Sequence, residues 1–335
     1  MSSYSEAGVD VAASDRFTES IADRVTATWG DNVVGRFGDF AAGITIPSGY
    51  EEPVLMMTTD GVGTKAEIAR SLGRFDGIGQ DLVAMCVDDL AAQAATPLGF
   101  TDYLAVGALD PVRDGALVAS VAMACRLAGC ALLGGETAVH PGVMGPDQFD
   151  LAGAALGVVE RGGMLSPDRV SAGDAVLGLP SPNLRSNGFS LVRSVFSESD
   201  YQRPALGSTL GEVLLGPSVL YAPAIGALVA DVAVSGLVHV TGGGLPGNLP
   251  RALPAGLGAS IDRSRWQPPP IFELISDQGR IDRQEMFHTF NMGIGFAVIL
   301  PRPQVPVAVE ALAGQGQPAS VIGEIVSGEG VTFTS

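Results

Sequence analysis

Lysine is nearly absent from this chain of 335 residues, and positive charge is scarce altogether. Lys65 is the only lysine, so arginine supplies the other 18 of the 19 basic side chains, against 36 acidic ones. The resulting net charge of −17 argues against nucleic acid or an anionic membrane surface as a partner. A phosphorylated small molecule would have to be met by local basic groups, backbone N–H groups or a bound cation.

Cysteine and histidine are also rare, with three of each. Cys86, Cys125 and Cys130 lie in apolar stretches, which predicts reduced, buried thiols. No Cys/His cluster has the spacing of a zinc site, so any metal is expected to be a hard cation held by oxygen ligands. The N-terminus has neither the basic start nor the apolar run of a signal peptide, and we therefore expect a cytoplasmic protein.

Three common catalytic signatures are missing: the Walker A loop, the protein-kinase set and the G-x-S-x-G elbow. Gly242, Gly244 and Gly247 formally match the dinucleotide fingerprint, but Pro246 interrupts it and no Rossmann-like pattern of strands surrounds it. If the chain uses ATP, it does so on another scaffold.

The chain is longer than one core usually supports, and its composition of 46% hydrophobic and 16% charged residues is typical of a packed globular protein. Strands and helices occur in both halves without strict alternation, which predicts two α+β domains. The polar stretch 161–173 separates them, giving an N-terminal domain over 1–165 and a C-terminal domain over 170–335. Helices are expected at 14–29, 78–95, 115–128, 189–196, 219–233, 271–275 and 305–313, and strands at 54–59, 98–106, 131–133, 149–160, 175–179, 237–240 and 319–325. The stretch 291–299 is expected to be a loop that runs into a further strand.

The first candidate site follows the strand 54–59. Asp60 comes at its C-terminal end, Gly61 and Gly63 leave the next backbone bare, and Thr64 and Lys65 close the loop. These are the parts of a phosphate and metal site, in which a compact ammonium would meet a phosphate oxygen. The alternative, that a single lysine had to fall somewhere, stays open at this point.

Three aspartates mark the predicted helix 78–95. At 100° per residue, Asp81, Asp88 and Asp89 fall within an arc of about 100°, and apolar residues cover the rest of the surface. Carboxylates on so narrow a stripe must be solvated, paired with cationic side chains or bound to a cation.

Three further glycine-containing segments follow predicted strands or precede helices. Gly134-Gly135-Glu136-Thr137 would place a carboxylate beside a bare backbone, or form a plain turn. Ser186-Asn187-Gly188 would bind an anion at a helix N-terminus, or simply cap it. Thr241-Gly242-Gly243-Gly244 could wrap a phosphate.

Together, six ordered motifs resemble those of the phosphoribosylformylglycinamidine cyclo-ligase (aminoimidazole ribonucleotide synthetase) family, and the resemblance covers nearly the whole chain. Tyr4–Asp10 also resembles that family's N-terminal motif. The motifs are Thr59-Asp60-Gly61-Val62-Gly63-Thr64-Lys65, Asp81-Leu82-Val83-Ala84-Met85-Cys86-Val87-Asp88-Asp89-Leu90, Gly134-Gly135-Glu136-Thr137, Ser186-Asn187-Gly188-Phe189-Ser190-Leu191-Val192-Arg193, Thr241-Gly242-Gly243-Gly244-Leu245-Pro246 and Phe290-Asn291-Met292-Gly293-Ile294-Gly295.

The resemblance implies a homodimer of two-domain α+β subunits whose N-terminal domains pair through β structure. It implies ATP-dependent ring closure of formylglycinamidine ribonucleotide to aminoimidazole ribonucleotide, with ATP and Mg2+. Site residues carried over with it fall into four groups. Catalytic residues would be Lys65, Asp89 and Arg185; the nucleotide would contact Asp60, Gly61, Gly63, Thr64, Lys65, Gly134, Gly135 and Glu136; Mg2+ would contact Asp60, Asp88, Asp89 and Glu136; substrate or phosphate would contact Ser186, Asn187, Gly188, Thr241, Gly242, Gly243 and Gly244.

The chain departs from the family pattern at two positions. Asp88 stands where the family usually has Asn, and Arg185 stands where it usually has His. An extra carboxylate would favour a cation, whereas Arg cannot exchange protons near neutral pH as His can. Another ATP-dependent synthetase or kinase of the same fold, or a nucleotide-binding dimer without turnover, therefore remain as alternatives.

Overall fold

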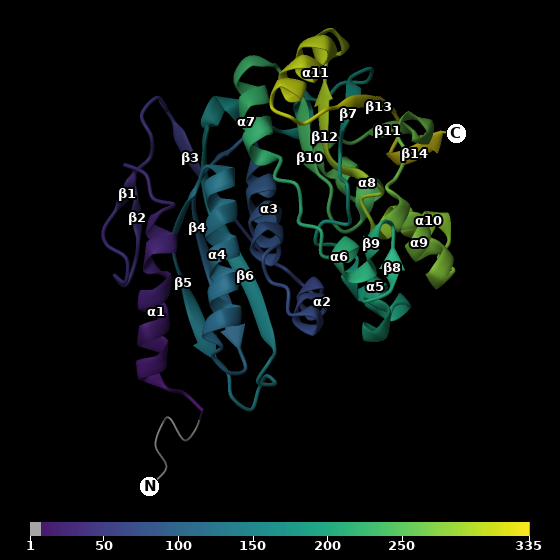
Figure 1. The fold of residues 1–335 in the computed structure, drawn as a ribbon. Helices are drawn as coiled ribbons and strands as arrows, with labels where there is room; N and C mark the ends of the chain where they lie inside the picture. Colours follow the sequence, from purple (N-terminus) through teal and green to yellow (C-terminus); the bar gives the residue numbers. More distant parts are fainter. Residues whose placement is uncertain (1–7, 335) are drawn as a thin grey trace.

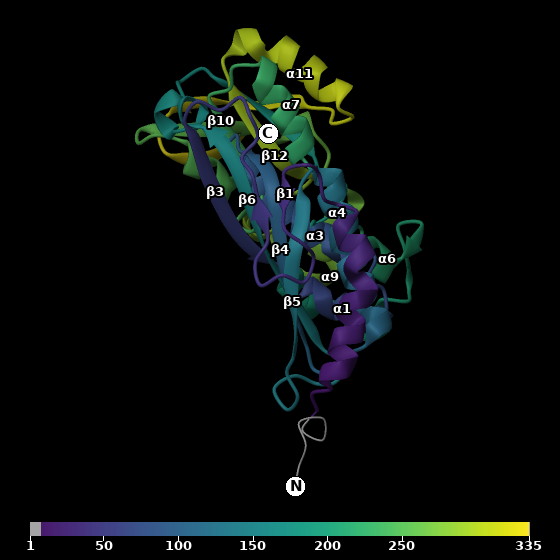
Figure 2. The same cartoon turned by 90° about the vertical axis from the view of Figure 1, so that its left-hand side faces the viewer.

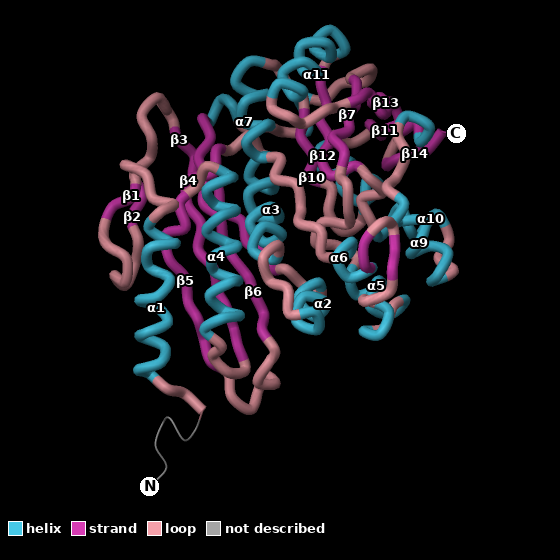
Figure 3. The backbone as a smooth tube through the Cα atoms, viewed as in Figure 1, coloured by secondary structure: helices cyan, strands magenta, loops and turns pink. Residues whose placement is uncertain are grey.

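A computed structural model describes residues 8–334. The segment Tyr4–Asp10 therefore lies mostly outside the described residues. Figure 1 shows two groups of strands side by side, with helix α3 (Ile78–Ala91) between them. Figure 3, in which strands are magenta, shows the same separation into two sheets. Within residues 8–334, no helix is both long and apolar enough to cross a membrane.

The N-terminal half is built on a four-stranded mixed sheet in the order β3-β6-β4-β5. Helix α3 packs on β3, β6 and β4 and on α4, while α1 packs on α4 and β5. Figure 2 shows these helices on one side of the sheet. The elements of this half are α1 (Val11–Thr26), β1 (Val33–Val34), β2 (Gly43–Ile44), β3 (Pro53–Gly61), α2 (Lys65–Leu72), α3, β4 (Thr96–Val106), α4 (Pro111–Ala128), β5 (Ala131–Val139) and β6 (Phe149–Glu160).

The opposite face of this sheet carries exposed apolar side chains. Along β3, exposed and partly buried residues alternate, as expected for a strand covered on one face only. Leu55 and Met57 are 51% and 76% exposed, and Tyr103 on β4 is 43% exposed. We call the surface formed by these three side chains the open face.

The C-terminal half is built on a six-stranded sheet in the order β10-β12-β7-β13-β11-β14, where only β11 and β14 run parallel. Helices α7 and α11 pack against each other. Its elements are β7 (Ala175–Pro180), α5 (Phe189–Val195), β8 (Pro204–Ala205), β9 (Ser208–Thr209), α6 (Leu210–Leu214), α7 (Ala222–Asp231), β10 (Gly236–His239), α8 (Gly244–Asn248), β11 (Leu257–Asp262), α9 (Pro270–Gly279), α10 (Arg283–Thr289), β12 (Ile294–Leu300), α11 (Val305–Gly314), β13 (Ser320–Ser327) and β14 (Gly330–Thr334).

The α+β class is confirmed, and several predicted elements hold closely, β6 to the residue. Two predictions fail near the candidate site. Strand β5 does not end at residue 133: it continues to Val139, because its parallel pairing with β4 resumes from Gly134 after a register shift. Lys65 closes no loop either, since it is the first residue of α2.

Helix α3 joins the two halves. One side packs on β3, β4 and β6, and the other packs on α7 and β10. The helix therefore has almost no solvent-facing surface, and even Asp81 and Asp88 are buried. Its polar groups must find partners on both halves of the chain.

Candidate functional site

Two of the predicted metal ligands lie close together where the halves meet. Asp60 is the penultimate residue of β3, and its Oδ1 accepts a 2.7 Å hydrogen bond from the Gly61 N–H. Burial, and after it the nearby charge of Asp89, raise the pKa of Asp60 against the lowering effect of that hydrogen bond. Two mutually repelling carboxylates on neighbouring elements form a place where a cation would be stabilised.

His239 completes this cluster, and the sequence analysis missed it. Its Nδ1 lies 2.8 Å from Asp89 Oδ1, while its Nε2 is buried without a hydrogen-bond partner among the described residues. Burial alone would raise the pKa of Asp89, but the hydrogen bond and charge of His239, helped by Arg251, lower it overall. Asp89 is therefore held as a carboxylate. A usable signal existed: like Asp60, His239 is a polar residue at the end of an apolar strand, just before a glycine-rich segment.

A cavity of about 310 Å³ opens beside this cluster, between the two halves of the chain. Asp89 and His239 line it, and Arg251 contributes a positive charge. Ser166 from the segment between the halves also contributes to the wall. The volume is at the small end of ligand pockets, and it combines an apolar wall with a few convergent polar groups.

The three loops expected to hold phosphate come together at this junction between the two halves, which we call the seam. Ser186 Oγ donates to the Val62 carbonyl at 2.9 Å, and the hydroxyls of Thr64 and Ser190 lie 3.2 Å apart. A Cβ on Gly242 would lie 3.6 Å from Asn187 Oδ1, so the third loop is adjacent. Segments far apart in the sequence thus assemble next to Asp60 and Asp89.

Lys65, in contrast, is fully buried and engaged with protein groups. Its Nζ lies 2.6 Å from Asp81 Oδ2 and donates to the carbonyls of Gly216 at 2.8 Å and Arg185 at 3.1 Å. The ammonium thus lies against three protein oxygens, two hydrogen-bonded carbonyls and one paired carboxylate. The structure therefore gives Lys65 an internal role in place of the phosphate contact expected from the sequence.

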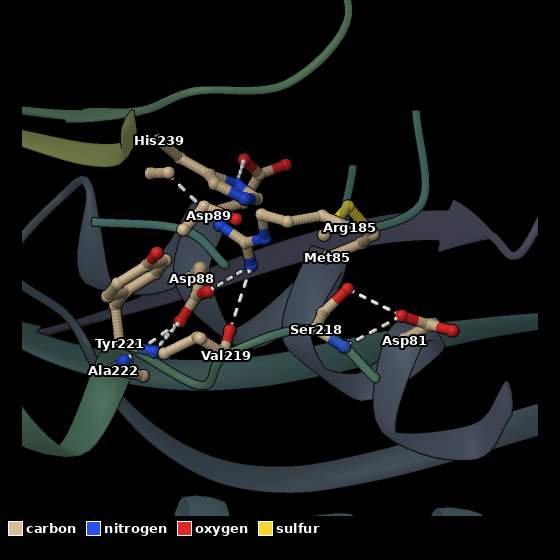
Figure 4. A network of polar contacts seen from close by, with 12 residues as sticks. Asp81, Met85, Asp88, Asp89, Arg185, Ser218, Val219, Tyr221, Ala222 and His239 are labelled. Atoms are coloured by element: carbon tan, nitrogen blue, oxygen red, sulfur yellow. Dashed lines mark hydrogen bonds and ion pairs between the residues drawn. The ribbon is translucent and has the colours of Figure 1, made fainter. Parts of the chain in front are cut away.

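Asp88 and Arg185 are likewise buried, and they bind each other. Figure 4 shows the Arg185 guanidinium against one Asp88 oxygen, while the other oxygen accepts from the N–H groups of Tyr221 and Ala222. Both Asp88 oxygens thus already accept hydrogen bonds from protein groups. This corrects the expectation that Asp88 coordinates a metal ion and that the Arg185 side chain faces substrate.

Glu136 is also separated from the cluster. Asp60, Gly153, Asp102 and Gly135 form one row across the sheet, which places β5 three strand spacings, about 14 Å, from β3. Glu136 pairs with Tyr103, on the open face. Within one chain, the expected four-carboxylate metal site is not assembled, and the described residues contain no group of three or more His, Cys, Asp or Glu placed to hold a metal ion.

Comparison with known families and structures defines the class of protein. Residues 38–159 match the N-terminal domain, and residues 171–335 the C-terminal domain, of AIR synthase related proteins. A thiamine-monophosphate kinase from Stenotrophomonas maltophilia has a similar fold, with a TM-score of 0.71 and 22% identity over 94% of this chain and 95% of that one. The hydrogenase maturation protein HypE in complex with ATP gives 0.68 and 21%, over 94% and 87%. The chain is thus a two-domain protein of the AIR synthase related fold.

Sequence relatives narrow the class. A phosphoribosylformylglycinamidine cyclo-ligase from Sorangium cellulosum is 47% identical over 98% of this chain and 97% of its own. A cyclo-ligase of the same name from Oceanobacillus iheyensis is 43% identical over 99% and 98%. The chain belongs to the phosphoribosylformylglycinamidine cyclo-ligase family.

Proposed function

We propose that the chain catalyses the ATP-dependent ring closure of formylglycinamidine ribonucleotide to 5-aminoimidazole ribonucleotide, releasing ADP and phosphate in purine biosynthesis. The near-full-length similarity to cyclo-ligases supports this reaction, and the cluster of Asp60, Asp89 and His239 at the seam carries it structurally. The buried free thiols Cys86, Cys125 and Cys130 fit the reducing cytoplasm that we propose as its location.

The reaction requires activation of a poor electrophile. An amide carbonyl carbon resists attack and its oxygen leaves badly, so ATP would phosphorylate the formyl oxygen to give an iminophosphate. An amidine nitrogen then attacks the carbon, and phosphate leaves with that oxygen. Such phosphoryl transfer depends mainly on positioning and on neutralising charge.

Asp60 and Asp89 are the proposed Mg2+ ligands. Two carboxylates fit this ion, because Mg2+ usually takes one or two carboxylates and completes its shell with water and substrate phosphates. When bound, the ion would neutralise phosphate charge. His239 orients Asp89 through Nδ1, which would hold the carboxylate toward the ion.

The surrounding loops would bind the two substrates. Gly61, Gly63 and Thr64 would follow the nucleotide phosphates, and Ser186-Asn187-Gly188 with Thr241-Gly242-Gly243-Gly244 would hold the ribose phosphate or the transferred phosphoryl group. Backbone N–H groups suit this purpose in a chain with so little positive charge. Their assembly at one seam supports the proposal.

A homodimer would use the open face. Leu55, Met57 and Tyr103 expose apolar surface on one side of the N-terminal sheet, and such surface on a sheet face is typical of protein interfaces. Glu136, together with Gly134 and Gly135 on the same strand, would then belong to the proposed dimer region rather than to the Asp60–Asp89 cluster of the same chain.

The direct test is an assay with formylglycinamidine ribonucleotide, ATP and Mg2+, following aminoimidazole product and ADP together. We expect both to appear in equal amounts and to require the amidine substrate. ADP formed only when thiamine monophosphate replaces that substrate would identify a kinase of the same fold instead. Nucleotide binding without ADP release on any amidine or amide would identify a binding protein.

A further inference from the structure

Asp88 and Arg185 connect the two halves of the chain through a fully buried ion pair at the seam. Both residues have no solvent-accessible side-chain surface, and Arg185 Nη2 lies 2.5 Å from Asp88 Oδ2. Asp88 Oδ1 accepts the N–H groups of Tyr221 at 2.9 Å and Ala222 at 2.8 Å. One carboxylate on α3 therefore binds two separate segments of the C-terminal half.

The Arg185 side chain also makes several contacts within the C-terminal half. Its Nη1 donates to the Gly295 carbonyl at 3.1 Å and its Nη2 to that of Val219 at 3.2 Å, and the guanidinium stacks 4.8 Å from the Tyr221 ring centre. Its φ of 61° lies in the left-handed region, which a residue with a side chain occupies only when its surroundings require it. The pair thus fixes a backbone position as well as a side chain.

The neighbours of the pair in sequence are the groups of the candidate site. Asp88 precedes Asp89, which binds His239, and Arg185 precedes Ser186, which binds Val62 of the Gly61–Gly63 loop. A shift of α3 against residue 185 would change the distance between the proposed metal ligand and the proposed phosphate loop. Figure 4 shows the Asp89–His239 and Asp88–Arg185 contacts beside each other.

We propose that Asp88 and Arg185 act as a single positioning unit, which sets the placement of Asp89 relative to the Ser186-Asn187-Gly188 loop without contacting substrate. In this unit Arg185 makes no proton transfer. The catalytic reading of this unit rests on the proposed function.

The chemistry of the pair predicts how substitutions combine. In Asp88→Asn, the amide oxygen can still accept from Tyr221 and Ala222, but the NH2 group faces the guanidinium, donor against donor. A buried guanidinium is then left without a counter-charge. Adding Arg185→His removes that charge and offers a ring nitrogen that can accept from the amide. The double variant should therefore recover what the single variant loses.

The experiment compares wild type, Asp88→Asn and Asp88→Asn/Arg185→His at a temperature where circular dichroism shows each to be folded. We expect kcat/KM to fall on the order of 100-fold in Asp88→Asn, the usual result of misplacing catalytic groups by about 1 Å. The double variant should return to within about 3-fold of wild type, because two residues in direct contact are strongly coupled and the second change offsets the first. A double variant as slow as Asp88→Asn, or an Asp88→Asn variant with wild-type kcat/KM, would overturn the proposal.

Asp114→Asn provides the matched control. Asp114 is fully buried and its Oδ1 pairs with Arg113 Nε at 2.6 Å, but both residues lie on α4 within the N-terminal half. This variant should lose stability while its folded fraction keeps kcat/KM. If Asp88→Asn does not fold, the double variant alone decides, since the proposal requires it to be folded and active.

Amide hydrogen exchange separates this proposal from the proposed function. In Asp88→Asn, residues 219–222 should exchange faster while α4 does not, and the double variant should restore protection, whatever reaction the protein catalyses. Wild type without ring-closing activity would count against the proposed function only. Unchanged exchange across residues 219–222 in Asp88→Asn would count against the positioning unit only.

Discussion

The ammonium of Lys65 and the carboxylate of Asp81 form a fully buried ion pair, with Nζ 2.6 Å from Oδ2. Asp81 Oδ1 in turn accepts from the N–H and hydroxyl of Ser218, at 2.9 and 2.5 Å. Burial lowers the pKa of Lys65 and raises that of Asp81, and the attraction between them opposes both shifts. The pair therefore links α2 and α3 to residues 216–218 of the C-terminal half at a high desolvation cost.

Lys65→Met should destabilise the protein by about 3–5 kcal/mol, because it leaves the Asp81 charge buried without its partner. Chemical denaturation would measure this loss. Adding Asp81→Asn should recover part of it, since a neutral amide can still accept from Ser218. Arg74→Ala breaks the half-exposed pair with Glu212 and should cost less than about 1 kcal/mol. Equal losses for Lys65→Met and Arg74→Ala would contradict a structural role for Lys65.

The sequence was sufficient to predict the helices and strands around this pair, but not which side chains form ion pairs there. Helical periodicity placed Asp81, Asp88 and Asp89 on one stripe, and all three prove to be paired, with Lys65, Arg185 and His239. The partners of Asp88 and Asp89 lie 97 and 150 residues away along the chain, so the local sequence pattern does not predict them. A scarce lysine after a glycine loop indicated a special role, and only the packing of α2 decided which.

The strand prediction near Glu136 failed for a related reason. Paired glycines normally end a strand, but Gly135 is needed in β5 because a Cβ there would lie 2.2 Å from Asp102 Oδ1. Glycine here gives room to a neighbour within the sheet and does not mark a turn. Continued pairing with β4 therefore places Glu136 on the open face. Such pairing depends on non-local register, which glycine content alone does not reveal.

Asp89→Asn should reduce turnover far more than stability. The Asp89 side chain is 39% exposed, and it contacts the proposed metal and substrate region instead of the core. We expect kcat to fall at least about 100-fold, the usual cost of losing a key electrostatic group, with a change of about 1 kcal/mol or less in unfolding free energy. Asp60→Asn should weaken metal binding too. Titrating Mg2+ during the assay should then show that both variants need a higher Mg2+ concentration for half-maximal activity. Parallel losses of activity and stability in Asp89→Asn would identify it as a structural residue.

Asp102 should make stability depend on pH. It is 9% exposed on β4, and burial raises its pKa from 3.8 to about 7, against the lowering effect of a backbone hydrogen bond. Between about pH 4 and 7 the folded state keeps a proton that the unfolded state has lost, so stability falls as pH rises through this window. The shift of about 3 units corresponds to about 4 kcal/mol in total.

Asp102→Asn removes this titration, since an amide stays neutral. Unfolding free energies of wild type and variant, measured from pH 4 to 8, should therefore differ increasingly with pH, and the variant should gain relative stability as pH rises. Asp277→Asn, an exposed carboxylate on α9, serves as the control and should leave the profile of wild type unchanged. Parallel profiles for wild type and Asp102→Asn would contradict a protonated Asp102.

Met57→Glu should dissociate the proposed homodimer. Met57 is the most exposed of the apolar side chains on the open face, and a carboxylate there would be buried against the partner without a counter-charge. Light scattering should show wild type at twice the chain mass and Met57→Glu at the chain mass, with the fold retained by circular dichroism. Val307→Glu, on α11 and 52% exposed, places the same charge on another exposed apolar residue and should leave the mass unchanged. A monomeric wild type would contradict the proposed homodimer. A Met57→Glu variant that stays dimeric would show that the interface lies on another surface.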